Sequence, residues 1–317
     1  MSTFYLDCID SEMSLEAGTL VVRSGDRRQT VPIGLLKRLV IAAKTRLDTM
    51  LLLRLAEQGV TVVLFDPRRL ERRAQVLGSA HNDVRVRLAQ YRASADESRR
   101  LALAREWVAA KLRRHSSLLG MVASSRPELR GSAHAAAQRI IALQKSVSVV
   151  DNLAAMRGLE GSAAQVFFEV YQRLFAPSLG FTGRKKRPPP DPVNATLSLA
   201  YTLLHARAVQ AAWTAGLDPS VGFYHEPAWG RESLACDLIE PWRPCIDRSV
   251  YGWFRSRYLE ADHFKRQAGG CFLDKAGRSK FFAAFERQMA PLERALRLQC
   301  RALVRSLTEE GHASSVS

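Results

Sequence analysis

The sequence contains few cysteines and no cysteine motif. Its five cysteines are widely spaced and none forms a C-x-x-C pair: Cys8, Cys236, Cys245, Cys271 and Cys300. A disulfide framework needs a dense and even set, and a structural zinc site needs closely spaced thiolates. We therefore expect scattered thiols of a reducing compartment, with neither a disulfide nor a zinc site.

Long apolar runs are also missing. No segment has the run of about 18 apolar residues from which a transmembrane helix is built. The first residues, MSTFYLDCIDSEM, carry acids where a secretory signal peptide has a basic head and an apolar core. These absences predict a cytoplasmic protein with no membrane partner.

Two common catalytic motifs do not occur: the phosphate-binding pattern G-x-x-x-x-G-K-[ST] and the nucleophile pattern G-x-S-x-G. Without the first pattern, the chain has no cradle for nucleotide hydrolysis. Without the second, it lacks the serine turn of an α/β-hydrolase. Both enzyme classes are therefore disfavoured.

Acidic residues are scarce beside basic ones. The 317 residues include 47 Lys and Arg against 31 Asp and Glu, which gives a net charge of +16 and a pI near 10.2. Clustered cations gain free energy by releasing condensed counterions from phosphates, so nucleic acid is the leading partner. The alternative is a well-solvated basic surface without a specific ligand.

The N-terminal part of the chain breaks into short apolar runs separated by turn residues. Alternation with Val, Ile and Thr predicts β-strands in FYLDC, GTLVVRSGDRRQTVPIG, RLVIA and VTVVLFD. The apolar spacing of three and four in TRLDTMLLLRLAEQG predicts one helix. We expect residues 1–78 to form a small β-sheet or sandwich domain.

After Gly78 the composition changes to Ala, Leu, Arg and Gln at helical intervals. The expected helical segments cover residues 83–119, 132–175, 193–215, 237–257 and 278–310. Three successive prolines predict a loop over 178–194, and GGCFLDKAGR resembles a hairpin. The whole chain is therefore expected to be α+β, with a larger all-α domain over 79–317.

One acid falls on an apolar helix face. Apolar residues trace a stripe through DNLAAMRGLEGSAAQVFFEVYQRLF, and Glu160 completes the series. A buried anion becomes protonated, finds a cation or coordinates a metal. Gly158 and Gly161 flank it, which suits a group that approaches the backbone closely. The alternative is structural: Glu160 lies at the edge of the stripe and pairs with an arginine such as Arg157, and the glycines permit a helix crossing.

A histidine and further acids gather in GFYHEPAWGRESLACDLIEPWRP. Alone, His225 fits a hydrogen-bonded loop residue better than a ligand. Asp237 and Glu240 are three residues apart, which on a helix places both carboxylates on one face. They equally fit a capping box, with Asp237 as the N-cap and Glu240 three residues later. Glu226 and Glu232 are interpreted as solvated or salt-bridged.

In combination, these groups make a ligand set. A histidine nitrogen with two or three carboxylate oxygens suits Mg²⁺ or Mn²⁺, because hard cations prefer oxygen and an imidazole shifts the preference toward Mn²⁺. A zinc site usually includes a second histidine or a thiolate. Beside DNA phosphates, such an ion polarises the phosphorus and neutralises the leaving oxygen.

Four segments, in this order and spacing, resemble the CRISPR-associated integrase of the spacer-acquisition complex, the Cas-one family: MRGLEGSAAQVFF, FTGRKKRPPPDPVNATLSLAYTLL, GLDPSVGFYHEP and SLACDLIEPWRPCIDRSV. The likeness covers nearly the whole chain, since that family has a β-domain followed by an α-domain. The resemblance implies a metal held by Glu160, His225 and Glu240. It makes Asp237 a supporting carboxylate, either behind the ligands or as a helix cap. It also implies a basic DNA-binding segment: Arg184, Lys185, Lys186 and Arg187.

The same resemblance implies a function. The chain would be a metal-dependent DNA endonuclease and integrase that joins the 3′-hydroxyl ends of short double-stranded DNA to the CRISPR repeat by transesterification. Its cofactor would be Mg²⁺ or Mn²⁺. It would form a homodimer through the N-terminal β-domain and bind a small partner, Cas-two.

Three rivals share parts of this pattern. A stand-alone metal-dependent nuclease or a transposon-type integrase would use the same ligands. In a non-catalytic DNA-binding protein, Glu160, His225 and Glu240 would be structural. An RNA-binding scaffold is disfavoured, because no aromatic stacking motif is evident.

Overall fold

The computed structural model describes residues 2–79, 81, 83–185, 188–267 and 269–313. The chain divides into two compact units, Met1–Asn82 and Asp83–Ser317. Strands dominate the first unit and helices the second, so the expected α+β fold class is confirmed. No described helix is long and apolar enough to cross a membrane.

Two sheets make up the first unit. Its described strands are β1 (Ser2–Leu6), β2 (Ser11–Glu16), β3 (Thr19–Ser24), β4 (Arg27–Pro32), β5 (Leu36–Ile41), β6 (Thr45–Leu47), β7 (Thr61–Asp66) and β8 (Arg69–Val76). In one sheet β1, β5 and β7 run parallel and β8 lies antiparallel at the edge. In the other, β3 lies antiparallel between β2 and β4, and β6 joins β2 in parallel.

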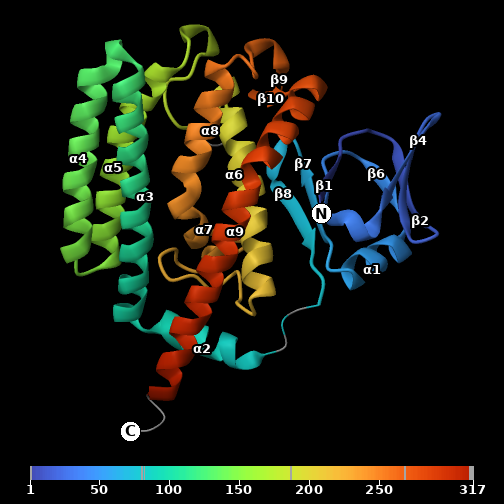
Figure 1. The fold of residues 1–317 in the computed structure, drawn as a ribbon, viewed down its shortest axis with the longest axis horizontal. Helices are drawn as coiled ribbons and strands as arrows, with labels where there is room; N and C mark the ends of the chain where they lie inside the picture. The colour runs from blue at the N-terminus through green and yellow to red at the C-terminus, as the bar shows by residue number, and fades with distance from the viewer. Residues whose placement is uncertain (1, 80, 82, 186–187, 268, 314–317) are drawn as a thin grey trace. The chain divides into compact units, whose positions relative to one another are not determined.

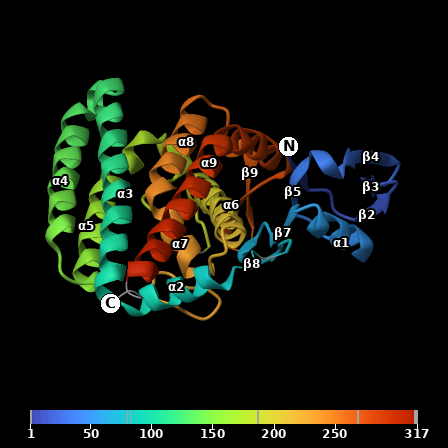
Figure 2. The ribbon, with the colours of Figure 1, turned by 60° about the horizontal axis from the view of Figure 1, so that its bottom comes forward.

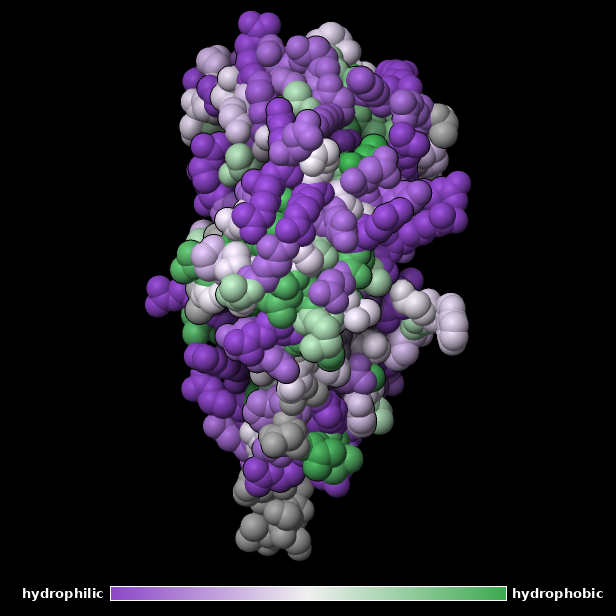
Figure 3. Space-filling model, turned by 90° about the vertical axis from the view of Figure 1, so that its right-hand side faces the viewer, coloured by the Kyte–Doolittle hydropathy of each residue, from purple (hydrophilic) through white to green (hydrophobic). Residues whose placement is uncertain are grey.

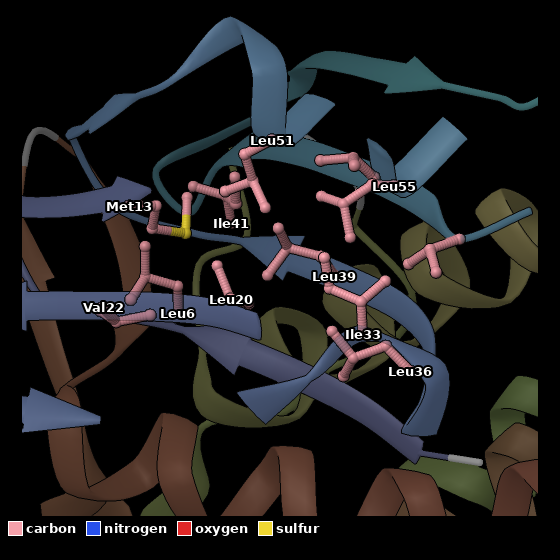
Figure 4. Close-up of a cluster of buried hydrophobic side chains, with 12 residues drawn as sticks. Leu6, Met13, Leu20, Val22, Ile33, Leu36, Leu39, Ile41, Leu51 and Leu55 are labelled. Carbon is pink, nitrogen blue, oxygen red and sulfur yellow. The ribbon is translucent and has the colours of Figure 1, made fainter. Parts of the chain in front are cut away.

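The core of the first unit lies between these strands and helix α1 (Thr49–Glu57). Met13, Leu20 and Leu39 from the strands are fully buried together with Leu51 and Leu55 from the helix (Figure 4). Burying a side chain of this size stabilises the fold by about 1.5–3 kcal/mol. This cluster therefore gives the first unit a core of its own.

Helix α1 is shorter than the helix predicted over residues 45–59. The Asp48 carboxylate accepts a hydrogen bond from the Met50 N–H at 2.9 Å, which fixes the helix start at Thr49. The preceding residues, Thr45–Leu47, pair with β2 instead. An N-cap side chain thus separates a strand from a helix within one apolar stretch.

The first unit also carries exposed apolar side chains. Four of them are more than half exposed: Ile9, Leu35, Met50 and Leu53. Figure 3 shows one face of the molecule, on which hydrophobic residues lie among hydrophilic ones. Exposed apolar side chains that form a contiguous patch are typical of a surface that contacts another protein.

The second unit is built mainly from helices. They are α2 (Val84–Ala95), α3 (Glu97–Ser125), α4 (Arg130–Val149), α5 (Leu153–Tyr171), α6 (Pro192–Thr214), α7 (Ser233–Ile239), α8 (Arg243–Arg255) and α9 (Lys275–Ala313). A hairpin of β9 (Phe264–Gln267) and β10 (Gly270–Leu273) precedes α9. Helices α3, α4 and α5 lie side by side in both ribbon views (Figure 1, Figure 2). Helix α6 is buried on all sides and packs against α7, α8 and α9.

One predicted helix is interrupted. The segment expected over 237–257 consists of α7, a 3-10 turn over Glu240–Trp242, and α8. Pro241 lacks a backbone N–H and clashes with the preceding turn, so the α-helical hydrogen bonding stops there. Helix α7 begins at Ser233, so Asp237 lies inside the helix. The predicted capping box is therefore wrong.

Candidate metal site

Glu160 lies on α5 at the edge of the apolar face. Met156 and Ala163 on that face are buried, whereas 21% of the Glu160 side chain is exposed. The Tyr224 hydroxyl donates to Glu160 Oε2 at 2.9 Å, and the Lys111 ammonium donates to Oε1. The carboxylate has therefore found a cation, one of the three outcomes expected for an acid on this face.

The structural alternative for Glu160 holds in part: the acid lies at the edge of the apolar face and pairs with a cation, but that cation is Lys111 and not Arg157. Arg157 does not pair with Glu160, because its guanidinium donates to Glu226 at 2.9 Å. Gly158 and Gly161 serve no helix crossing, since no atom of another described element lies within 4 Å of a Cβ built at either glycine. The two glycines leave open space on α5 beside the carboxylate.

Lys111, on α3, joins the two acids. Its ammonium also donates to Glu240 Oε2 at 2.6 Å. Glu240 is buried, and its Oε1 accepts a hydrogen bond from Arg243 Nε at 2.6 Å. Glu160 and Glu240, which are far apart in the sequence, therefore lie on either side of one ammonium nitrogen.

The surroundings keep this cluster charged. Burial raises the pKa of the Glu240 carboxyl, but nearby cations, Arg243 and Lys111 foremost, hold it below its ordinary value. Burial lowers the pKa of the Lys111 ammonium, but Glu240 and Glu160 raise it above its ordinary value. Burial and Glu160 both raise the pKa of the Tyr224 hydroxyl, which stays a hydrogen-bond donor.

His225 lies in the loop before α7, and Asp237 holds it there. Asp237 Oδ1 accepts from the His225 N–H at 2.9 Å and lies 2.6 Å from Nδ1 of the ring. Asp237 Oδ2 accepts from the N–H groups of Phe223 and Tyr224, at 2.7 and 3.0 Å. Asp237 is fully buried behind the histidine, and 29% of the His225 side chain is exposed. The imidazole Nε2 is left as the nitrogen available to a ligand.

Two arginines fix the same loop to the helices. Arg100 on α3 donates to the Phe223 carbonyl at 2.9 Å and to Glu226 at 2.6 Å. Arg157 on α5 contacts Glu226 as well. Glu226 is therefore salt-bridged, in agreement with its interpretation from the sequence.

The predicted DNA-binding segment is described only in part. Lys186 and Arg187 lie outside the described residues. The Lys185 side chain is exposed. Arg184 is partly buried and donates to Asn194 Oδ1 at 2.9 Å, so it braces the start of α6. Of the two described cations, Lys185 is therefore the one presented to solvent.

A buried polar layer connects α3, α6 and α8 behind the acids. The Tyr201 hydroxyl donates to Asp247 Oδ1, and His115 Nε2 lies 3.4 Å from Asp247 Oδ2. The Arg243 guanidinium lies over the Tyr201 ring, 4.7 Å from its centroid. Because Arg243 also holds Glu240, this layer restricts the position of the buried acid.

The two carboxylates fit a hard cation. The Lys111 nitrogen contacts both carboxylates, so the pair already accommodates one positive charge, and carboxylate oxygens are preferred ligands of Mg²⁺ and Mn²⁺. The predicted third donor does not join them directly. Across the described ranges, no group of three or more His, Cys, Asp or Glu side chains is placed to hold a metal ion. His225 is nevertheless near the acids: its charge is among the causes that lower the pKa of Glu240, and its ring lies edge-on to that of Tyr224 at 5.2 Å between centroids.

The sequence motifs assigned no role to three residues of this cluster: Lys111, Tyr224 and Arg243. A signal existed for Lys111, because it shares a buried helix face with Val108 and His115. A cation on an apolar face is the same kind of anomaly as Glu160. Arg243 could have been found from its spacing of three residues to Glu240. Tyr224 offers no such signal, because its partner lies on another helix.

The chain matches a known protein family along most of its length. Residues 4–287 match the family model described as CRISPR associated protein Cas1. The CRISPR-associated endonuclease Cas1 1 of Thermodesulfovibrio yellowstonii is 35% identical, and the match covers 98% of each chain. The match therefore includes both units and every residue of the candidate site.

Solved structures share the fold. A chain described as a casposase bound to integration product has a TM-score of 0.87 at 22% identity, over 98% of this chain and 91% of that one. A chain of a Cas6-RT-Cas1–Cas2 complex has a TM-score of 0.84 at 20% identity, over 98% of this chain and 35% of that one. At these identities, the likeness shows the fold alone.

Proposed function

Because the chain belongs to the CRISPR-associated Cas1 family, we propose that it works as the DNA endonuclease and integrase of CRISPR adaptation. In this reaction, the 3′-hydroxyl end of a short foreign duplex attacks a phosphodiester of the CRISPR repeat. One P–O bond forms and another breaks, so the reaction is a transesterification that needs no nucleotide cofactor. The second unit carries the reaction.

The observation that carries this proposal is the convergence of Glu160 and Glu240 on one cation, beside a histidine held by a buried acid. Phosphoryl transfer depends on positioning and on neutralising charge more than on a protein nucleophile. The cluster offers anionic oxygens and an imidazole rather than a serine or cysteine. These groups can position a cation at a phosphate, which is what phosphoryl transfer requires of the protein.

Glu160, Glu240 and His225 would hold a Mg²⁺ or Mn²⁺ ion. When bound, such an ion supplies charge neutralisation at the scissile phosphate and orients the oxygens around it. Asp237 would accept a hydrogen bond from Nδ1 of His225, so that Nε2 is the nitrogen that would face the ion. Tyr224 and Arg243 fix the orientation of the two carboxylates.

The partners are part of the same proposal. The names of the related structures, which include an integration product and a Cas1–Cas2 complex, support DNA and Cas2 as partners of this chain. Residues 79–317 would act as the catalytic domain and residues 1–78 as the dimerisation domain of a homodimer. The exposed apolar residues of the first unit support that contact. Lys185, Lys186 and Arg187 would bind the DNA backbone, whereas Arg184 would brace this segment through Asn194. The reaction would take place in the cytoplasm.

The test is a joining reaction with purified components. The chain and its Cas2 partner are incubated with Mn²⁺ or Mg²⁺, a labelled short duplex with free 3′ ends, and a supercoiled plasmid that bears the repeat. Label should enter the plasmid. The changes Glu160→Gln, Glu240→Gln and His225→Ala should each lower joining by about a hundredfold or more, as expected when transition-state charge loses a partner.

A matched control comes from the same helix. Glu169 on α5 is exposed, and Glu169→Gln should leave joining unchanged. Joining that persists in the three site variants would support the non-catalytic rival. Nicking without joining would support the stand-alone nuclease, and joining at sites other than the repeat would support the transposon-type integrase.

A further inference from the structure

Lys111 occupies a special position among the basic residues of the second unit. Its side chain is 8% exposed, and its single ammonium contacts Glu160 and Glu240 together. A buried cation is costly unless anions compensate it, so these two contacts keep the ammonium in place. Because the carboxylates belong to α5 and to the turn after α7, Lys111 also joins three separate segments.

Each of the four carboxylate oxygens of Glu160 and Glu240 accepts one hydrogen bond from a side chain. Tyr224 donates to one oxygen of Glu160, and Arg243 donates to one oxygen of Glu240. Lys111 takes the other oxygen of each acid. Withdrawing the ammonium would therefore free one oxygen on each carboxylate, while the second oxygen of each keeps its donor.

We propose that Lys111 is a positioning residue. Its ammonium is a counter-cation that holds Glu160 and Glu240 together in the metal-free protein, and the divalent cation displaces this ammonium when it binds. The proposal rests on the proposed function, because it assumes that this pair binds the metal. It adds that metal binding and the Lys111 contact exclude each other.

Elementary electrostatics favours this exchange. Two carboxylates that share a site repel each other, and the single positive charge of Lys111 between them holds them together. A divalent ion at the same place offers twice the charge to the same oxygens. The lysine stem has four flexible carbons, so the ammonium can withdraw without displacing α3.

Removing the ammonium should therefore have opposite effects on the free and the metal-bound protein. In Lys111→Met, the side chain keeps its length but loses the charge. Without metal, this variant should unfold at a lower temperature than the wild type, because Glu160 loses its cation and Glu240 keeps only Arg243. Its Kd for Mn²⁺ should be lower by about tenfold or more, because the ion no longer displaces a competing cation.

The experiment measures Mn²⁺ binding to the full chain by calorimetry and its thermal unfolding with and without Mn²⁺. Glu160→Gln is the reference for loss of a metal ligand. If the wild type binds Mn²⁺, Glu160→Gln does not, and Lys111→Met binds equally or more weakly, then the Lys111 proposal is wrong and the metal proposal stands. If the wild type does not bind Mn²⁺, both proposals fail.

A second measurement uses the wild type, so it does not depend on the folding of a variant. Lysine acetylation by a small reagent is followed by mass spectrometry, with Lys145 as the exposed control on α4. Labelling of Lys111 should be slow in the free protein and rise several-fold with saturating Mn²⁺, while labelling of Lys145 stays constant. Lys111 that remains protected in the Mn²⁺-bound protein would overturn the proposal.

Discussion

At the scale of single residues, one oxygen of each carboxylate accepts a hydrogen bond from a fixed donor: Tyr224 for Glu160 and Arg243 for Glu240. The Tyr224 hydroxyl has a raised pKa because of its burial and its contact with Glu160, so it remains protonated. Burial lowers the pKa of the Arg243 guanidinium, but its contact with Glu240 raises that pKa above its ordinary value. These donors restrict the rotation of the acids, and only the Lys111 contact is left to exchange.

The pH dependence of folding stability tests the buried environment of His115. Burial lowers the pKa of His115 below its ordinary value of 6.5, Asp247 opposes this shift, and Lys111 adds to it. Below about pH 6.5, the unfolded chain binds a proton at this position that the folded chain excludes. Stability should therefore fall with decreasing pH, at up to about 1.4 kcal/mol per pH unit from this residue.

The change His115→Gln should make that slope shallower. The measurement is urea unfolding of the full chain at several pH values between 7.5 and 5, compared with the wild type. His134 on α4 is exposed, so His134→Gln should keep the wild-type slope. An unchanged slope in His115→Gln would mean that the histidine is protonated in the folded protein.

At the scale of elements, the loop before α7 and α7 itself form one unit around Asp237. Gly222 lets the loop approach the helix, because a Cβ there would lie 2.7 Å from Asp237 Oδ2 and 2.8 Å from the Ser233 carbonyl carbon. The carboxylate then accepts three backbone N–H groups and faces the His225 ring. The histidine is thus positioned by the backbone of its own loop.

Asp237→Asn should release this loop. The amide keeps the shape but replaces one acceptor oxygen with a donor that faces N–H groups, at a cost of about 2–4 kcal/mol. Chemical unfolding should show this loss. Glu226→Gln changes the same loop at an exposed ion pair and should cost less than about 1 kcal/mol. Equal costs for the two variants would show that Asp237 does not organise the loop.

Sequence patterns predicted the elements with clear periodicity and missed those without it. The β-rich start and the helical remainder were recognised, whereas β2 and β8 were not. The hairpin predicted over residues 269–278 lies earlier, because β9 precedes that segment and α9 begins at Lys275. Strand β8, RLERRAQV, is polar along most of its length because it lies at a sheet edge. The short strand β6 was assigned to a helix because the apolar spacing of α1 extended over it.

The candidate site was predictable to the extent that its residues violate a local pattern. Glu160 on an apolar face signalled a partner, but the identity of that partner depends on how α3 and α5 pack. The role of Asp237 depends on hydrogen bonds to a loop that folds back on the helix, which spacing alone cannot specify. Pairings across the chain therefore required the structure.

At the scale of the whole molecule, the net charge of +16 is unevenly distributed. Residues 83–317 hold 35 of the 47 basic residues and 22 of the 31 acidic ones, so this part carries +13. Lys111 is neutralised inside the fold by Glu160 and Glu240, and Arg157 pairs with Glu226 at the surface. The excess is therefore borne by side chains outside the site, such as exposed Lys185, where phosphates can reach it.

This distribution predicts DNA binding that depends steeply on salt and little on sequence. If about six phosphates are neutralised, affinity for a short duplex should fall by a few hundredfold between about 0.1 and 0.3 M NaCl. Fluorescence anisotropy with two duplexes of unrelated sequence should give the same slope of log K against log salt. Lys185→Ala should reduce that slope by about one unit, because each phosphate contact releases its own counterion. A shallow slope would mean that the basic residues are only solvated, because counterion release is the one source of affinity that needs no base contact and still weakens steadily as salt is added.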